Sequence, residues 1–120
     1  MATPTTALLL RSDAMACRVT AARLSRLGFA VKEFGDEAHL YAHAISLRPG
    51  DPSYVILAEP TTDVVRDLEI LRAVRRSTPM VLLGSAASPE TARRLRAACV
   101  PREQPTSEEL RAAIDVAVQA

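Results

Sequence analysis

The stretch YVILAEPTTD, from Tyr54 to Asp63, decides the fold class. Its first five residues are apolar without alternation, as in a strand that is buried on both faces, and Glu59 and Pro60 begin a turn at its carboxyl end. A strand buried on both faces needs helices above and below it, so the stretch predicts an α/β protein. Functional groups of such proteins collect beyond the carboxyl ends of strands, which makes Glu59 the first candidate functional residue.

Apolar runs and helical patterns alternate along the rest of the chain. Strands are predicted over Thr6–Leu10, Phe29–Phe34, Tyr54–Ala58, Met80–Gly84 and Cys99–Arg102. Helices are predicted from Asp13 to Gly28, over Asp36–Leu47 and Val64–Arg76, from Ser88 to about Ala98, and from Ser107 onward. Because a helical crossover lies between successive strands, we expect a doubly wound, five-stranded parallel sheet with helices on both faces. In the third helix, Val64, Leu68, Leu71 and Val74 are expected on the buried side.

Length and composition indicate one domain with a full core. The chain has 120 residues, 48% of them apolar, and a formal net charge of +1, so we expect a single domain over residues 1–120. Charges are balanced and only two Phe, two Tyr and no Trp are present, so no DNA partner is expected. The sequence contains no recognisable signal peptide and no apolar run of membrane-spanning length. We therefore expect a cytoplasmic protein without membrane contact.

Cysteine and histidine residues form no motif for a disulfide or a metal. Cys17 and Cys99 lie far apart and outside any CxxC pair, so both are expected to be reduced, partly buried thiols. His39 and His43 are four residues apart on the second predicted helix, a spacing that could present both to one metal ion. No third ligand is nearby in the sequence, so they are interpreted as partly exposed polar residues. We expect no metal, no cofactor and no catalytic residues.

Several segments together resemble a known family. They are, in chain order, ALLLRSDAMA (7–16), LSRLGFAV (24–31), YVILAEP (54–60), DLEILRAVR (67–75), TPMVLLGSA (78–86) and EQPTSEELRAAI (103–114). In this order and spacing they resemble the receiver domains of two-component response regulators over essentially the whole chain. The resemblance implies the CheY-like (flavodoxin-like) strand order 2-1-3-4-5 and a role in bacterial signal transduction. The crevice of such a sheet lies beyond its first and third strands.

The resemblance also implies a phosphorylation site, but the matching positions carry other residues. Receivers accept a phosphoryl group from a histidine kinase on an Asp after the third strand, with Mg²⁺ held by two acids after the first strand. A Lys and a Ser or Thr neutralise the added oxygens. In this sequence the two acids fall on Arg11 and Ser12, the phosphoacceptor on Glu59, the hydroxyl on Gly84 with Ser85 beside it, the lysine on Gln104, and the aromatic switch near Pro101. Lys32, the only lysine, is on the second strand.

These replacements predict a degenerate pocket. Arg11 places a cation where the divalent ion would bind and repels it, so no metal site is expected. Two interpretations of Glu59 stay open. It could mimic the phosphorylated acid, with its charge held near Arg11, or it could be a carboxylate at a strand end that is hydrogen-bonded to Ser12 or to the turn at Thr61.

Charged residues of the last two helices define a candidate interaction face. In receivers, the face of the fourth helix, fifth strand and fifth helix binds partners and forms dimers. Here that face would carry Arg93, Arg94, Arg96, Arg102, Glu108, Glu109 and Arg111. A solvated surface would show the same pattern. A second arginine cluster, RAVRRSTP (72–79), could clamp phosphate, and such patches suggest cyclic-dinucleotide binding in some atypical receivers.

The sequence favours an atypical receiver, or pseudo-receiver, that acts as a phosphorylation-independent protein-interaction module in bacterial signalling. Its expected partners are signalling proteins, with a second copy of the chain as one candidate. One alternative is a regulator that binds an anionic nucleotide, such as a cyclic dinucleotide, through its arginines. The other is a receiver with residual phosphoacceptor activity at Glu59.

Overall fold

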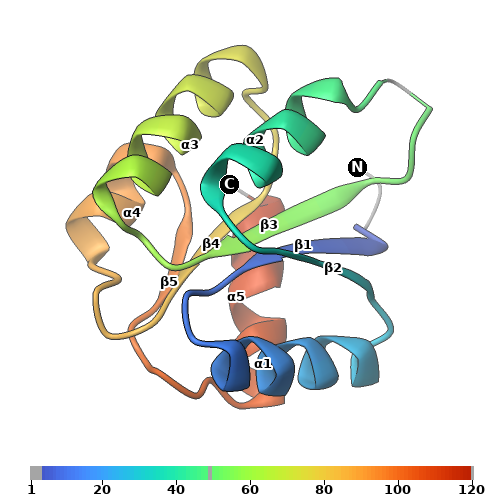
Figure 1. Cartoon of the computed structure of the whole chain (residues 1–120), viewed down its shortest axis with the longest axis vertical. Coiled ribbons are helices and arrows are strands. Elements are labelled where there is room, and N and C mark those ends of the chain that lie inside the picture. Colours follow the sequence, from blue (N-terminus) through green and yellow to red (C-terminus); the bar gives the residue numbers. More distant parts are fainter. Residues whose placement is uncertain (1–3, 49, 120) are drawn as a thin grey trace.

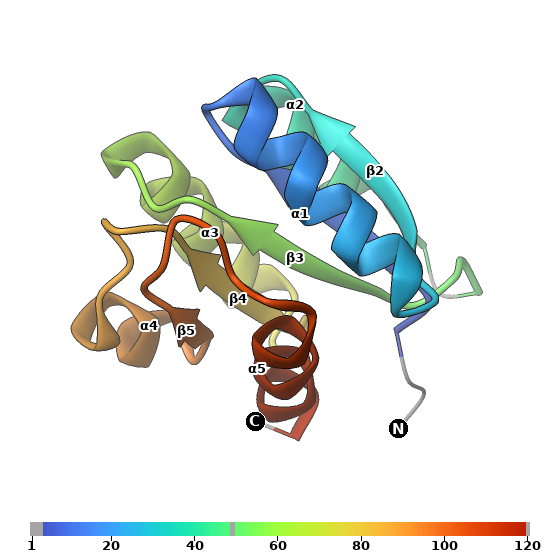
Figure 2. The same cartoon turned by 90° about the horizontal axis from the view of Figure 1, so that it is seen from below.

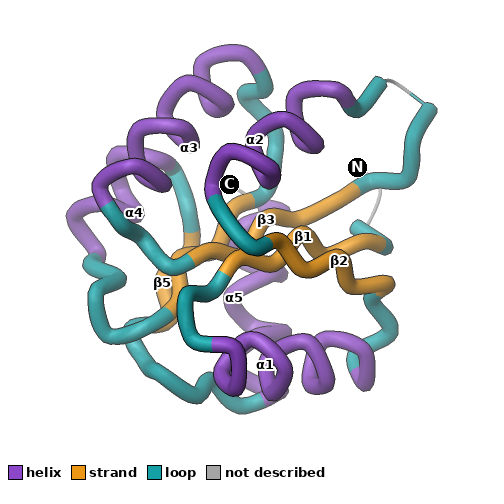
Figure 3. Tube along the Cα trace, viewed as in Figure 1, coloured by secondary structure: helices purple, strands orange, loops and turns teal. Residues whose placement is uncertain are grey.

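Strands and helices alternate along the computed structural model, which describes residues 4–48 and 50–119. The strands are β1 (Thr6–Leu10), β2 (Ala30–Phe34), β3 (Tyr54–Ala58), β4 (Met80–Leu83) and β5 (Ala98–Val100). The helices are α1 (Ala14–Arg26), α2 (Glu37–Ser46), α3 (Thr62–Val74), α4 (Pro89–Leu95) and α5 (Ser107–Gln119). Figure 3 distinguishes the strands, helices and loops along the trace.

The strands form one parallel sheet in the order β2-β1-β3-β4-β5. This confirms the predicted fold class and strand order. Strand order reverses between β1 and β3, whose paired residues run from Thr6 and Tyr54 to Leu10 and Ala58. Both strands therefore end at the same level, and the residues that follow them lie side by side.

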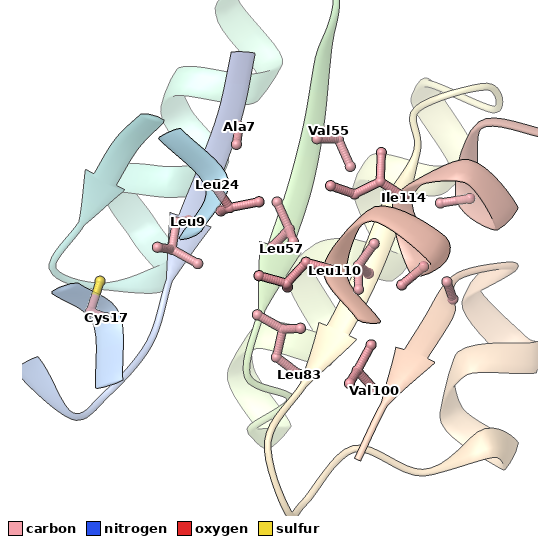
Figure 4. Packing of buried hydrophobic residues seen from close by; sticks show 14 residues of the cluster. Ala7, Leu9, Cys17, Leu24, Val55, Leu57, Leu83, Val100, Leu110 and Ile114 are labelled. Atoms are coloured by element: carbon pink, nitrogen blue, oxygen red, sulfur yellow. The ribbon is translucent and has the colours of Figure 1, made fainter. Parts of the chain in front are cut away.

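The helices cover both faces of the sheet, α1 and α5 on one and α2, α3 and α4 on the other (Figures 1 and 2). Side chains alternate along each strand, so one face buries Leu9, Leu57 and Leu83 and the other buries Leu8, Ile56 and Leu82. Figure 4 shows Leu57 of β3 between Leu24 of α1 and Leu110 of α5. The apolar runs that predicted the strands are thus the two layers of the core.

The ends of α3 and α4 differ from the prediction. Val74, expected on the buried side of α3, is 61% exposed, because the buried positions after Leu71 fall on Arg72 and on the half-buried Arg75. The helix also begins two residues before Val64, with the Thr61 hydroxyl accepting a hydrogen bond from the Val64 amide as its N-cap.

Helix α4 ends well before Ala98. Arg96 adopts the left-handed conformation, with φ of 53°, and the Ala97 amide bonds back to the carbonyl of Ala92. These contacts close the helix, and β5 starts already at Ala98, one residue earlier than predicted.

The cysteines lie on opposite faces of the sheet. Cys17 belongs to the core beneath α1 and α5, whereas Cys99 packs against the core of the other face, so the two cannot form a disulfide with each other. Burial and a hydrogen bond to Glu33 raise the pKa of Cys17 to about 11. Both side chains are therefore thiols, and Cys17 is a weak nucleophile at neutral pH.

The two histidines also have separate environments. The ring of His39 is exposed and contacts Asp36, the N-cap of α2, whereas the ring of His43 lies against Phe34. Among the described residues, no three His, Cys, Asp or Glu side chains are grouped so that they could hold a metal ion. No described helix has the length and apolar character needed to cross a membrane.

Candidate functional site

The candidate site lies beyond the carboxyl ends of β1 and β3, where Arg11 meets Glu59. Leu10 and Ala58 are the last paired residues of these strands, and the Glu59 amide continues the ladder by donating to the Leu10 carbonyl at 3.1 Å. The next residue of each strand is the charged one. The strand register therefore brings the two side chains together, although 48 residues separate them in sequence.

Arg11 is a buried cation that is held on several sides. Its side chain has no exposed surface, and its Nε donates to Glu59 Oε1 at 2.9 Å. Its Nη1 donates to the hydroxyl of Thr20 on α1 at 3.1 Å and to the carbonyl of Glu103, in the loop after β5, at 2.7 Å. The guanidinium group thus links β1, β3, α1 and the β5–α5 loop.

Both carboxylate oxygens of Glu59 accept hydrogen bonds. Oε1 accepts from Arg11 Nε and from the Ser12 amide at 3.3 Å, and Oε2 accepts from the Ser12 hydroxyl at 3.2 Å. The Glu59 side chain is 20% exposed. Glu59 thus makes the Arg11 contact expected for a mimic of the phosphorylated acid and the Ser12 bonds expected for a carboxylate at a strand end, so both interpretations stay open.

A second carboxylate, Glu103, completes the site. It accepts from the Ser85 hydroxyl at 2.6 Å and from the Ser85 amide at 3.0 Å, and its other oxygen lies 3.5 Å from Arg11 Nη2. These two hydrogen bonds from Ser85, and then the charge of Arg11, hold the pKa of Glu103 below its usual value. Glu103 is therefore ionised at neutral pH and shares the charge of Arg11 with Glu59.

Gly84 closes the crevice at the end of β4. Its φ is +95°, a backbone conformation that residues other than glycine rarely adopt. A Cβ at this position would lie 3.4 Å from Glu59 Cγ. The hydroxyl that the resemblance implies at this position is absent. Ser85, considered as its replacement, instead bonds to Glu103.

The structure separates the remaining residues of the predicted pocket from this centre. Gln104 is exposed, and it is the preceding residue, Glu103, that contacts Arg11. Pro101, at the position of the aromatic switch, is also exposed and lines a groove between α4, β5 and α5. Thr61 caps α3, and its amide donates to the backbone carbonyl of Glu59 at 3.1 Å, not to the Glu59 carboxylate.

The residues of the predicted interaction face are dispersed. Arg93 and Glu109 line the groove between α4, β5 and α5, which has a volume of about 570 Å³ and walls of mostly Ala and Val. Arg102 pairs with Glu109 at 2.9 Å beside it. Arg94 instead pairs with Glu69 of α3.

The other three residues of that face do not line the groove. Arg96 lines a hollow with Arg72, and Arg111 approaches the Leu27 carbonyl at 3.5 Å, next to the end of α1. Glu108 is exposed on the first turn of α5. The groove, with Arg93 and Glu109, is therefore the part of the predicted face that is built as one surface.

In the predicted arginine cluster at residues 72–79, the buried Arg72 and the half-buried Arg75 hold backbone carbonyls. Arg72 donates to the carbonyls of Leu95 and Arg76, and Arg75 to the carbonyls of Ile45 and Leu47. The exposed member of the cluster is Arg76. The cluster therefore does not present its arginines as one clamp.

The residues at the crevice do not fit a magnesium ion. Mg²⁺ takes several oxygen ligands in an octahedral arrangement, usually with carboxylates among them. Here the two nearby carboxylates, Glu59 and Glu103, already contact the guanidinium group of Arg11. A second cation in this place would meet the charge of Arg11 at close range.

Comparison with known proteins identifies the fold. Vibrio cholerae CheY4, a chemotaxis response regulator, superposes with a TM-score of 0.75 and 18% identity over 96% of this chain and 99% of that one. A receiver domain from Clostridium thermocellum gives a TM-score of 0.75 with 14% identity over 96% of this chain and 94% of that one. The chain has the fold of a response-regulator receiver domain. No protein-family profile and no curated protein matches the sequence.

Full-length FixJ from B. japonicum shows the same fold within a longer protein. The match covers 98% of this chain but 59% of FixJ, with a TM-score of 0.71 and 20% identity. At such identities the receiver fold is shared, while the residues of the site have to be interpreted from this chain itself.

Sequence reasoning missed two members of the site, Thr20 and Glu103. Thr20 is a buried residue of α1 whose hydroxyl accepts from Arg11 and donates to the Ala16 carbonyl at 2.8 Å. Glu103 precedes the position to which the family lysine was assigned. A signal for both was present, since a buried arginine needs several acceptors.

We predict strong energetic coupling between Arg11 and Glu59. Arg11→Met leaves Glu59 without its cation, and we expect it to lower the free energy of unfolding by about 2–4 kcal/mol. The double variant Arg11→Met/Glu59→Met should lose less than the sum of the two single variants by about 1–3 kcal/mol. Urea unfolding of the four proteins measures this difference.

The exposed pair Asp63–Arg66, at 3.0 Å, is the matched control. A cycle of Asp63→Leu and Arg66→Met should give a coupling below about 1 kcal/mol, because water screens both charges. A coupling at Arg11–Glu59 no larger than in this control would show that the pair does not organise the site.

Proposed function

We propose that the chain is an atypical receiver, or pseudo-receiver: one module over residues 1–120 that binds a protein partner without phosphorylation and without enzymatic activity. We place it in bacterial signal transduction in the cytoplasm. The observation that carries the proposal is the buried guanidinium of Arg11, which pairs with Glu59 in the crevice.

The contacts of Glu59 argue against phosphoryl transfer to it. Hydrogen bonds to both oxygens of Glu59, one of them from a guanidinium group, withdraw electron density from the carboxylate and make it a weaker nucleophile. The charge that builds up on a transferring phosphoryl group needs nearby cations, and Arg11 already compensates Glu59 and contacts Glu103. Residual phosphoacceptor activity is therefore the less supported alternative.

The groove between α4, β5 and α5 is the surface best suited to a protein partner. Its walls are mostly apolar, and Val116 of α5, which is 61% exposed, lies in it. Arg93 on α4 and Glu109 on α5, which also pairs with Arg102 of this chain, carry opposite charges on its two sides. Such a surface is self-complementary, because a second copy related by a two-fold axis would set each Arg93 against the Glu109 of the other copy. We therefore take a second copy of the chain as the first partner to test.

We predict that the protein takes no phosphoryl group from acetyl phosphate in the presence of Mg²⁺. Intact-mass spectrometry should find only the unmodified chain, because the Glu59 carboxylate is paired with the guanidinium group of Arg11. An added phosphoryl group that disappears in Glu59→Gln would overturn the proposal. The Arg11→Met variant, treated in the same way, shows whether the arginine alone prevents the reaction.

We predict that association depends on the groove and not on the crevice. Sedimentation velocity should show self-association in the wild type and its loss in Val116→Glu, since the substitution puts a charge on the apolar wall. Met15→Glu is the matched control, because Met15 is an equally exposed apolar side chain, at 65%, on a different helix. Arg93→Glu should weaken association in a salt-dependent way.

Glu59→Gln should leave association unchanged. If Glu59→Gln abolishes association and Val116→Glu leaves it intact, the crevice is the functional surface. If the wild type stays monomeric at every concentration, a second copy of the chain is not the partner that binds the groove. The same variants would then be tested for binding to a different protein.

A further inference from the structure

A buried arginine that has no carboxylate partner among the described residues lies at the end of the sheet opposite the crevice. Arg72 of α3 is 8% exposed, and its Nε donates to the Leu95 carbonyl at 2.8 Å, at the end of α4. Its Nη1 donates to the carbonyl of Arg76, just beyond α3. The negative ends of two helix dipoles therefore compensate its charge, and no ion pair does so among the described residues.

Two further arginines gather around it. Arg72 Nη2 lies 3.5 Å from the carbonyl of Arg96, so a single guanidinium holds the backbones of both Arg76 and Arg96. The side chains of these two residues are exposed and line one hollow with Arg72, Ser77, Thr78 and Ala117. None of these lining residues is acidic, and neither Arg76 nor Arg96 forms an ion pair with a described residue.

This arrangement is unfavourable for the chain alone. Arg96 has a φ of 53°, a conformation that costs a residue with a Cβ about 1 kcal/mol relative to glycine. Burial, together with the like charge of Arg96, lowers the pKa of Arg72. A glycine at position 96 would avoid both the backbone cost and the repulsion. An anion between the three cations would compensate them.

We propose that this hollow binds a phosphate-type oxyanion through Arg76 and Arg96, with the Ser77 hydroxyl as a further donor. The hollow has a volume of about 30 Å³, which holds one oxygen of the size of a water molecule. The remaining oxygens of the anion lie at its mouth, where the two exposed guanidinium groups reach them as charge-assisted hydrogen-bond donors.

A larger hollow adjoins the proposed site and could hold the organic part of a phosphorylated ligand. It has a volume of about 350 Å³ and shares Ser77 and Thr78 with the smaller one. Its walls include Tyr54, Pro79 and Arg75, whose buried Nε has no hydrogen-bond partner among the described groups. The shared chemistry is the phosphate group, whether it is free or carried by a nucleoside.

Thermal unfolding and calorimetry with two probes test the proposal. Wild-type protein is heated with inorganic phosphate or with ADP, against sodium chloride of the same ionic strength. We expect either probe to raise the unfolding midpoint. In Arg76→Gln/Arg96→Gly, the dissociation constant from calorimetry should rise at least about tenfold, because both charged donors are lost. Glycine suits the left-handed backbone at position 96, so this variant keeps the fold.

Arg18→Gln/Arg26→Gln on α1 is the control, because it removes the same charge from two exposed positions away from the hollow. It should bind both probes as the wild type does. Equal affinity for the two probes would mean that the site recognises the oxyanion alone. Tighter binding of ADP would mean that the larger hollow binds the nucleoside. Absence of binding beyond the chloride reference, or equal weakening in both double variants, overturns the proposal. The hollow shares no lining residue with the groove, although Arg96 and Ala117 directly adjoin the groove residues Ala97 and Val116 in the chain. Its test measures anion binding, whereas the proposed function is tested by self-association and phosphorylation, so the two can fail separately.

Discussion

The ion pair between Arg11 and Glu59 is the interaction on which the rest of the crevice depends. The parallel register of β1 and β3 places the two residues side by side, and the burial of Arg11 makes their contact necessary. A buried guanidinium without acceptors would cost several kcal/mol. It therefore recruits Thr20, the Glu103 carbonyl and both nearby carboxylates. Gly84 lies against Glu59, and its φ of +95° disfavours any residue with a side chain at this position.

A permanent cation has a consequence for signalling. The resemblance to receivers implies a crevice that passes between two arrangements when a phosphoryl group is added, and that shifts the population of the opposite face. In this chain the positive charge belongs to Arg11, the residue that follows β1, and the position of the aromatic switch falls on the exposed Pro101. The proposed function implies that a crevice with this permanent ion pair has one arrangement. The proposed interaction would then be constitutive and governed by the amount of partner present.

The sequence was sufficient for the fold and for most of the site. Continuous apolar runs predicted β1, β3 and β4, and the alternation over residues 29–34 predicted β2. The positions after the first and third strands identified Arg11, Ser12 and Glu59, because the carboxyl ends of these two strands meet at one crevice. Glu103 was missed because the loop after β5 has no periodicity that would tell which of two neighbouring side chains turns inward. Val74 was wrongly placed in the core, since the end of α3 buries Arg72 and Arg75 against backbone carbonyls. Apolar patterning cannot show that a charged side chain is buried as a helix cap.

The most direct test of a permanently closed crevice is an NMR titration of the protein with Mg²⁺ and beryllofluoride, which imitates a bound phosphoryl group. A closed crevice predicts that the amide signals of Ser12, Glu59, Gly84 and Ser85 stay unchanged at saturating concentrations. Saturable shifts of these signals, accompanied by shifts in α4 and β5, would contradict the account, because they would show that Arg11 yields its place and that the crevice still switches.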